Sequence, residues 1–439
     1  MSTPQLTALS TFRNLVSSCE LRSAVKEFLQ VPRYSGRSET IAFLCTDTAI
    51  DFIAIPVLWD LFRRVIVVRS NRWRDCLALH DAGWSVIADA RVPLGLPAPQ
   101  RRLFGDIVFA KGDDQCCGGS EHSISLATSG STGPPKYVRL PKESIVENAK
   151  ASVLSIDGYE RSTVVPCLSL GSSYGFSKQL ISPLIAEARV RCDGVGKVSN
   201  PFFDCGHVSN RMTVVLSPVQ LRAYVSNLES DLSARNWTVV CGGDYLHADT
   251  IERTFRQLRE LRIAHTYGLT ELGPRVSTNI LIAPPDESGA GVVGFPIAGA
   301  ETRVKKDKGV SLIEVRTPYG GLAYEDGTKI RQHYTDWVTT GDEGEMASDG
   351  RLRVFGRASS RSFSQRSLRL VENMVLGRFD VLSCRASIGV SSIDLDVRPG
   401  PGLSRRVKLK QADIVSAARE AGIDDRREIN VSITASSHG

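Results

Sequence analysis

A run of small and hydroxylated residues in the first third of the chain has the composition of a phosphate-binding loop. The run reads Thr128, Ser129, Gly130, Ser131, Thr132 and Gly133. Its backbone N–H groups and hydroxyls can surround a polyphosphate, to which Lys136 adds a positive charge. Two prolines precede Lys136, whereas a Walker loop needs its lysine directly after the second glycine. A flexible Ser/Gly linker seldom carries a diproline and a lysine, so we expect a nucleotide phosphate site here.

A second cluster combines an aromatic ring, a hydroxyl and a carboxylate within residues 265–271. A tyrosine such as Tyr267 can stack on adenine, and the hydroxyl of Thr270 can bond an α-phosphate. The carboxylate of Glu271 can hold a Mg²⁺ ion that bridges phosphates and neutralises their charge. On its own, the cluster fits a surface turn around a core tyrosine equally well.

Taken together, the two clusters resemble signature segments of the adenylate-forming, or AMP-binding, superfamily. This superfamily comprises acyl- and aryl-CoA synthetases, nonribosomal peptide adenylation domains and luciferases. Residues 128–136 resemble its T-S-G-[ST]-T-G-x-P-K-G loop, with Tyr137 in place of the last glycine, and residues 267–271 resemble its Y-G-x-T-E segment. The resemblance extends over residues 41–357 in unbroken order. It implies that ATP and Mg²⁺ are used to activate a carboxylic acid as an acyl-adenylate, with release of pyrophosphate.

The resemblance implies further nucleotide contacts in three later segments. Asp342, within T-G-D-E-G, is expected to bond both ribose hydroxyls, since one carboxylate can accept two bonds. Arg357 is expected to reach the ribose or the phosphates. The backbone of Gly242, Gly243 and Asp244 is expected to lie along the adenine.

Roles are implied for residues of the second cluster as well. His265, Tyr267, Gly268 and Thr270 are expected to contact the nucleotide. Lys136, Thr270 and Glu271 are the expected catalytic residues, and Glu271 is the expected metal ligand. Acyl transfer to CoA or to the thiol of a carrier protein is the implied second step.

The acid is expected to bind beside Ser173, Tyr174 and Gly175, with Gly268 on the nucleotide side. No acidic residue occurs between Arg161 and Pro183. A buried α-ammonium group without a carboxylate partner is costly, so an acyl or aryl acid is favoured over an α-amino acid. Tyr174 fits an ordinary core aromatic residue equally well.

The sequence departs from the superfamily pattern after residue 357. Ser360 and Phe363 stand where the hinge aspartate and lysine are expected, and the last lysines are Lys408 and Lys410. The resemblance therefore implies a shortened C-terminal domain, either because the sequence is truncated before the usual terminal lysine or because that lysine is absent. Two alternatives follow: an enzyme that stops at the adenylate or forms an amide, and a degenerate nucleotide- or acyl-binding module without turnover.

The elements that must position these residues follow from the hydrophobic pattern. Short β-rich runs alternate with helical stretches, which predicts parallel βαβ units. The predicted strands of this part are 41–45, 65–69, 85–89, 163–166, 189–192, 213–216 and 237–241. The predicted helices are 51–62, 73–81, 177–186 and 220–227. Beyond residue 291, short strands between Gly and Asp turns predict a small antiparallel barrel or sheet of strands 302–305, 311–316, 337–340, 344–347 and 352–355.

We therefore expect an α/β fold of two doubly wound subdomains and a small β subdomain, followed by a short α+β C-terminal domain. The expected division is a large adenylation domain, residues 1–357, and a small domain, residues 358–439. In the small domain, residues 358–367 are expected to be a linker, and residues 411–421 a helix.

Composition limits the other classes of function. The chain has 439 residues, 42% of them hydrophobic, and a net charge of +6 without a basic stripe, so no nucleic-acid partner is expected. No apolar run is long enough to span a membrane, and no signal peptide is recognised, so a cytoplasmic protein is expected. The ten cysteines lack the spacing of a zinc site or a disulfide framework.

Overall fold

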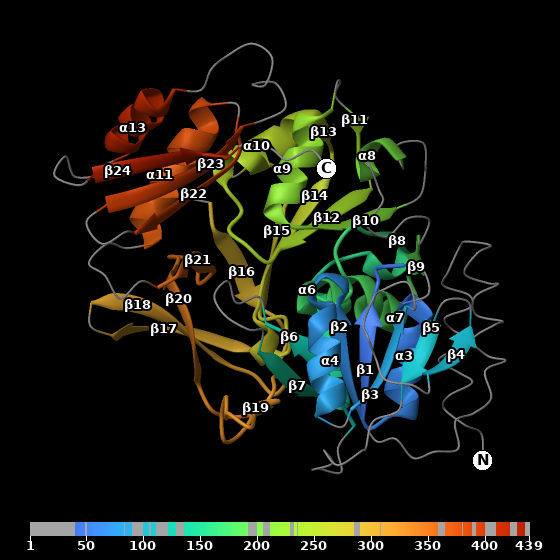
Figure 1. Ribbon diagram of the computed structural model, residues 1–439. Helices are drawn as coiled ribbons and strands as arrows, with labels where there is room; N and C mark the ends of the chain where they lie inside the picture. Colours follow the sequence, from blue (N-terminus) through green and yellow to red (C-terminus); the bar gives the residue numbers. More distant parts are fainter. Residues whose placement is uncertain are drawn as a thin grey trace.

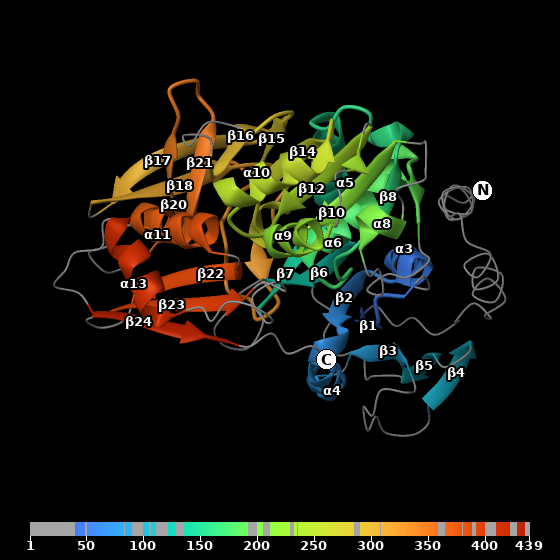
Figure 2. The same ribbon diagram turned by 90° about the horizontal axis from the view of Figure 1, so that it is seen from above.

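The fold consists of two large mixed sheets with a helical layer between them, and a smaller C-terminal unit (Figures 1 and 2). The computed structural model describes residues 40–48, 51–82, 84–89, 100–104, 107–110, 122–128, 136–191, 200–204, 211–228, 232–234, 236–284, 290–307, 309–358, 365–379, 381–388, 392–399, 410–421 and 428–434.

The first sheet has eight strands in the order β19-β7-β6-β2-β1-β3-β5-β4. Its strands are β1 (Thr40–Cys45), β2 (Arg64–Arg69), β3 (Ser85–Asp89), β4 (Gln100–Phe104), β5 (Ile107–Ala110), β6 (Ser123–Ala127), β7 (Tyr137–Pro141) and β19 (Ala323–Tyr324). The four central strands are parallel, as the βαβ pattern predicts. Side chains of β1 alternate between its two faces: Phe43 packs with helix α3 (Asp51–Leu61), and Leu44 with helix α4 (Trp73–Asp81).

The second sheet has eleven strands in the order β17-β18-β20-β21-β16-β15-β14-β12-β10-β8-β9. Its parallel part consists of β8 (Thr163–Pro166), β9 (Arg189–Val190), β10 (Met212–Leu216), β12 (Trp237–Gly242) and β14 (Arg262–Tyr267). Val214 faces a core under helices α9 (Pro218–Ser226) and α10 (Ala248–Gln257), while Val215 faces the opposite core. Three short elements complete this region: α8 (Pro201–Asp204) and the paired strands β11 (Leu232–Ser233) and β13 (Leu258–Arg259).

A central helical layer joins the two sheets. It contains α5 (Lys142–Leu154), α6 (Ser173–Gly175), the π-helical turn η3 (Phe176–Ile181) and α7 (Ser182–Ala186). Ile145 of α5 packs in the core of the first sheet, whereas Tyr174 of α6 packs with the second. The helical stretch predicted over 177–186 therefore begins earlier, at Ser173, because the Ser172 hydroxyl caps the N–H of Gly175 at 3.0 Å.

The antiparallel strands beyond residue 277 continue the second sheet. They are β15 (Ser277–Leu281), β16 (Val292–Pro296), β17 (Glu301–Asp307), β18 (Val310–Arg316), β20 (Val338–Met346) and β21 (Leu352–Arg357). The prediction of separate strands over 337–340 and 344–347 is wrong, because β20 runs through both. A register shift between Glu343 and Gly344, after the left-handed φ of +75° at Gly341, absorbs the turn-like residues within one strand.

The C-terminal unit has a core of its own. Its elements are α11 (Gln365–Arg378), β22 (Val381–Ile388), β23 (Ser392–Pro399), α13 (Gln411–Glu420) and β24 (Glu428–Ile433). The three strands form one sheet in the order β22-β23-β24, and both helices pack on it through buried residues such as Val371 and Ile414. The predicted helix 411–421 is confirmed, but the predicted linker ends sooner, since α11 begins at Gln365.

The C-terminal unit is docked against α9 and α10 of the second sheet (Figure 1). The buried guanidinium of Arg222, on α9, donates to the carbonyl oxygens of Leu376 and Val381 at 3.0 and 2.8 Å. His247, at the start of α10, lies 2.9 Å from the amide oxygen of Asn373 on α11. These contacts hold the unit beside the end of strand β12.

Candidate nucleotide and acid site

The predicted site segments follow the carboxyl ends of parallel strands, where α/β folds bind ligands. The phosphate loop follows β6, the acid segment follows β8, and the segments at Gly242 and Tyr267 end β12 and β14. A bridge between Ala127 and Ser172 brings the end of β6 against the start of α6. The fold therefore brings these segments together between the two sheets, at the carboxyl ends of their strands.

Most of the phosphate loop, residues 129–135, lies outside the described residues, including Ser129, Gly130, Ser131, Thr132 and Gly133. Its two ends are closed by a bond of 2.9 Å from the N–H of Thr128 to the carbonyl oxygen of Lys136. Tyr137, which replaces the glycine of the superfamily pattern, donates to Asp75 Oδ2 at 2.8 Å, on α4. The Tyr137 side chain is thus held against the first subdomain.

Lys136 and Glu271 meet at a residue that the sequence analysis missed. Lys136 Nζ lies 5.2 Å from the ring centroid of Tyr324, and the Tyr324 hydroxyl donates to Glu271 Oε1 at 3.0 Å. Burial, followed by the Glu271 charge, raises the pKa of Tyr324, so this phenol remains a donor at neutral pH. Strand β19 places Tyr324 here by pairing with Val138 of β7. No motif marks Tyr324 in the sequence, because its partners lie far away along the chain.

Glu271 fits the role of a magnesium ligand. It lies in the short helix η4 (Thr270–Leu272), and no basic side chain among the described residues forms an ion pair with it. Its negative charge is therefore available to a cation. Mg²⁺ is commonly held by one or two carboxylates together with substrate phosphates and water, so a single carboxylate beside a phosphate loop is a suitable donor set.

Thr270 connects the nucleotide segment to the acid segment. Its hydroxyl lies 2.7 Å from the hydroxyl of Ser173, and the Thr270 side chain is buried. Gly175 and Gly268 are both packed too tightly for a side chain: an added Cβ would lie 2.1 Å from Ser169 O and 1.9 Å from Pro274 O, respectively. The structure thus brings together the predicted α-phosphate ligand and the predicted acid-binding residues.

Tyr267, Asp342 and Arg357 form a second connected group. The Tyr267 hydroxyl donates to Asp342 Oδ2 at 2.6 Å, and Arg357 Nε lies 3.4 Å from Asp342 Oδ1. Burial raises the pKa of Asp342, while Arg357 and the Tyr267 hydroxyl oppose that shift. Both oxygens of Asp342 thus have protein partners. The Arg357 side chain is 64% exposed. A ribose can therefore displace Arg357 from Asp342 at a lower cost in free energy than it can displace Tyr267.

The remaining predicted nucleotide residues lie in different surroundings. His265 is buried, and its Nδ1 lies 3.0 Å from Val292 O. Burial lowers the pKa of His265 to about 4, so it is a neutral core residue.

The predicted adenine segment lies at the end of β12. Gly242 abuts strand β14, since an added Cβ would lie 2.5 Å from Thr266 O. Gly243 has a left-handed φ of +89°. Asp244 Oδ2 accepts a bond of 3.0 Å from Arg385 of the C-terminal unit.

Two cationic residues near the acid segment were also missed by the sequence analysis. Arg275 stacks on the ring of Tyr174 at 4.1 Å, and Lys178 lies one helical turn beyond Tyr174. Both side chains are buried. The sequence signal that could have indicated these two residues is a basic side chain at a core position. Residue type alone, however, does not reveal which positions are buried.

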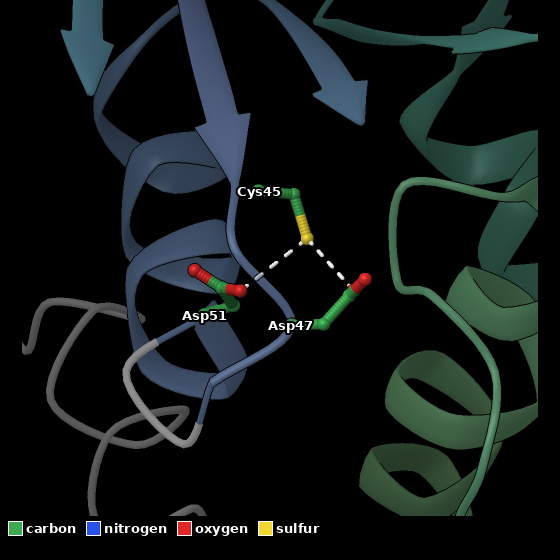
Figure 3. A group of neighbouring side chains, drawn as sticks. All are labelled: Cys45, Asp47 and Asp51. Atoms are coloured by element: carbon green, nitrogen blue, oxygen red, sulfur yellow. Dashed lines mark hydrogen bonds between the residues drawn. The ribbon is translucent and has the colours of Figure 1, made fainter. Parts of the chain in front are cut away.

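A separate trio, Cys45, Asp47 and Asp51, has potential ligand atoms within 4.8 Å of one another, as Figure 3 shows. Asp51 Oδ2 already accepts from the backbone N–H groups of Thr46 and Thr48, at 2.9 and 3.0 Å. Asp47 Oδ1 accepts from Leu170 N at 2.8 Å. These bonds shape the turn between β1 and α3, so we interpret the trio as structural.

Comparison with known proteins agrees with this arrangement. A sequence model described as "AMP-binding enzyme" matches residues 113–323. A medium-chain-fatty-acid–CoA ligase of Ectopseudomonas oleovorans is 25% identical over 54% of this chain and 47% of its own. A malonate–CoA ligase of Arabidopsis thaliana is 24% identical over 54% of this chain and 43% of its own. The matched region thus spans less than half the length of these relatives.

Solved structures share the fold over nearly the whole chain. O-succinylbenzoate–CoA synthetase of Bacillus subtilis, in complex with its acyl-adenylate intermediate, has a TM-score of 0.70 at 16% identity, over 95% of this chain and 90% of that one. ATP-bound MatB of Rhodopseudomonas palustris has a TM-score of 0.67 at 13% identity, over 97% and 88%. No helix within the described parts of the chain is long and apolar enough to cross a bilayer. These findings confirm the expected α/β fold, and the matched sequence model supports the resemblance to the AMP-binding enzyme superfamily over residues 113–323.

Proposed function

We propose that this protein uses ATP to activate a carboxylic acid as an acyl-adenylate and then transfers the acyl group to a thiol. The observation that carries the proposal is the convergence of Lys136 and Glu271 on Tyr324, beside the contact between Thr270 and Ser173. The lysine, the carboxylate and the segment to which we assign the phosphates, Mg²⁺ and the acid thus lie close together, which supports the proposal. The CoA ligases among the relatives support the same reaction class.

In the first step, a carboxylate oxygen of the acid attacks the α-phosphorus of ATP, and the bond to pyrophosphate breaks. Lys136 and the backbone of the phosphate loop bind the polyphosphate, and the hydroxyl of Thr270 orients the α-phosphate toward the acid at Ser173. Mg²⁺ bound at Glu271 would neutralise charge on the phosphates. Asp342 and Arg357 hold the ribose, and Tyr267 packs against the adenine.

In the second step, a thiol attacks the acyl carbonyl and AMP leaves. CoA and the pantetheine thiol of a carrier protein are the two candidate acceptors, and CoA is favoured by the names of the relatives. We assign residues 1–357 to the adenylation domain and residues 358–439 to a small domain. A cytoplasmic location suits these substrates, and Cys45, Cys76, Cys241 and Cys384 carry free thiols.

ATP–pyrophosphate exchange over a panel of fatty and aryl acids tests the first step. We expect exchange that requires both Mg²⁺ and an acid of the panel. Mass spectrometry of products with and without CoA tests the second step, and an acyl-CoA product is expected. Exchange without a thioester product would favour an adenylation-only enzyme or an amide ligase. Absence of exchange with every acid would favour a binding module without turnover.

A further inference from the structure

Arg275 and Lys178 are two buried cations, which we call the basic pair. Their exposed fractions are 2% and 0%. Within the described residues, no carboxylate forms an ion pair with either of them, and Arg275 Nε has no hydrogen-bond partner. Buried charges in proteins are normally paired, because removing an ion from water is costly. The basic pair is therefore an exception that needs a counter-anion.

Helix α5 fixes both members of the basic pair. The Asn148 side chain bonds the backbone of Arg275 in both directions, at 2.8 and 3.1 Å. One turn later on the same helix face, Ser152 accepts a hydrogen bond from the Lys178 amino group. The two cations are thus held in place by neutral groups, which leaves their charges uncompensated.

The basic pair lies among the residues that we assign to the acid. The Arg275 guanidinium is 4.1 Å from the Tyr174 ring centroid, and Nη1 is 3.4 Å from the hydroxyl of Thr266. Gly268 packs against the backbone just before Arg275, since an added Cβ would lie 3.0 Å from Arg275 Cα. Lys178 follows Tyr174 in the same continuous helical stretch.

The basic pair does not lie on the nucleotide side of strand β14. Thr266 and Tyr267 are neighbours on that strand, so their side chains point to opposite faces. Tyr267 contacts Asp342, on the side assigned to the ribose, whereas Thr266 contacts Arg275, on the side of the central helical layer. An anion bound by Arg275 therefore lies on the opposite face of β14 from the ribose contacts.

At neutral pH the pair carries at least one full positive charge. Burial lowers the pKa of Arg275 only to about 10, so its guanidinium remains protonated. Burial, followed by the charge of Arg275, lowers the pKa of Lys178 well below its ordinary value. A second anion nearby would favour the protonated form of Lys178 and thus recruit both cations.

We propose that the basic pair binds a second anionic group on the acid, so that the substrate is a dicarboxylic acid of which one carboxylate is adenylated. The inference rests on the proposed function for the location of the acid. It accounts for an acid segment without acidic residues, because two cations repel an α-ammonium group as well as attract a distal carboxylate. A plain fatty acid would leave Arg275 buried opposite a methyl group.

The first test compares acids that differ only in the distal group, such as hexanoate with adipate and benzoate with terephthalate. We expect kcat/KM for pyrophosphate exchange to be about 100-fold higher for the better diacid than for its matched monoacid, the scale of a bond between charged groups. Equal values, or a preference for the monoacids, overturn the inference. Exchange with monoacids alone would still leave the ligase proposal standing, so the two failures are distinguishable.

The second test removes the guanidinium while keeping side-chain length. In Arg275→Met, the ratio of kcat/KM for the diacid to kcat/KM for the monoacid is expected to fall about 100-fold. Exchange with the monoacid is expected to be retained, because the reacting end of the acid is untouched. Arg303→Met is the matched control, because Arg303 also stacks on an aromatic ring, Trp337 at 4.1 Å, but lies far from the acid segment in the sheet order. A diacid preference that survives in Arg275→Met overturns the inference.

A binding measurement separates the inference from turnover. In the presence of AMP, a diacid but not its monoacid should raise the melting temperature of the parent protein, and Arg275→Met should abolish that shift. If the diacid-specific rise in melting temperature is obtained without any pyrophosphate exchange, the proposed binding of a diacid by the basic pair is supported and the ligase proposal fails. If no diacid-specific shift and no diacid-specific exchange is found, the inference fails. Should Arg275→Met not fold by circular dichroism, Arg275→Lys must still prefer the diacid, though less strongly.

Discussion

The hydroxyl of Tyr324 donates a hydrogen bond of 3.0 Å to Glu271, and its ring faces the ammonium group of Lys136. One side chain thus contacts both the proposed metal ligand and the proposed phosphate lysine. Tyr324 reaches this position because β19 is the edge strand of the first sheet, although its residues lie in the segment that links the strands of the second. Tyr324 is therefore a positioning residue shared by the two sheets.

Tyr324→Phe removes the bond to Glu271 and keeps the ring under Lys136. We expect kcat/KM for pyrophosphate exchange to fall about 10-fold, for one lost hydrogen bond to a charged group, and the half-saturating Mg²⁺ concentration to rise. Tyr319→Phe, which removes a hydroxyl bonded to Ala298 O at 2.6 Å, is the control. A rate loss without any change in the Mg²⁺ requirement would contradict the positioning role.

Glu271→Gln removes the charge and leaves an oxygen that can still accept from Tyr324. The fold should therefore stay intact, while Mg²⁺-dependent exchange falls below detection because the proposed metal ligand is neutral. Circular dichroism and pyrophosphate exchange measure the two properties. Glu301→Gln, on an exposed strand, serves as the control. Unchanged exchange in Glu271→Gln would remove Glu271 from the mechanism.

Asp342→Ala should weaken ATP binding by about 2–3 kcal/mol, since two bonds to a charged acceptor are lost. Titration calorimetry with ATP in the absence of acid measures the effect. Asp349→Ala, which removes an exposed carboxylate paired with Arg351, is the control and should bind ATP as the parent does. Equal ATP affinity of Asp342→Ala and the parent would refute the ribose role.

Lys136→Ala should cost about 3 kcal/mol or more in transition-state stabilisation, the scale of a charged contact at the reacting phosphates. Lys410→Ala should cost little, because Lys410 is exposed at the start of α13. Lys408 lies outside the described residues, and Lys408→Ala completes the series. If Lys408→Ala abolishes exchange while Lys136→Ala barely changes it, a C-terminal lysine performs the role and the assignment of Lys136 is wrong.

Arg222→Met should destabilise the docked structure by about 3 kcal/mol. The substitution leaves the carbonyl oxygens of Leu376 and Val381 without their buried donor, and it removes the more buried of the two arginines that pair with Asp249. Urea unfolding measures the change. Arg253→Met, which removes a more exposed partner of the same Asp249, should cost less than about 1 kcal/mol. Equal costs would mean that the bonds to the C-terminal unit contribute nothing.

The sequence predicts the α/β fold because hydrophobic periodicity and chain order are local properties. Strand β1 and helix α13 begin and end within a residue of their predicted bounds. The prediction fails where pairing within the sheet outweighs local turn propensity. Gly341 and Asp342 are typical turn residues, yet β20 continues through them because the residues on either side pair with β18, and Asp342 pairs with Arg357 of β21.

The limits of the site prediction have the same origin. Thr270, Glu271 and Asp342 stand in short segments whose residue types indicate their chemistry. Tyr324 and Arg275 stand in no such segment, and their importance depends on partners that only the folded chain brings within reach. Residue type likewise could not show that His265 is buried against Val292.

The ion pair between Asp244 and Arg385 couples two equilibria. Asp244 is a proposed nucleotide contact at the end of β12, and Arg385 belongs to the C-terminal unit. A nucleotide that bonded the Asp244 carboxylate as well as its backbone would compete with Arg385, and its binding would then loosen this part of the docked interface. By reciprocity, docking would then weaken nucleotide affinity by the same factor by which the nucleotide weakens docking. The salt dependence of ATP binding should therefore report on the position of the C-terminal unit as well as on the charge of the ligand.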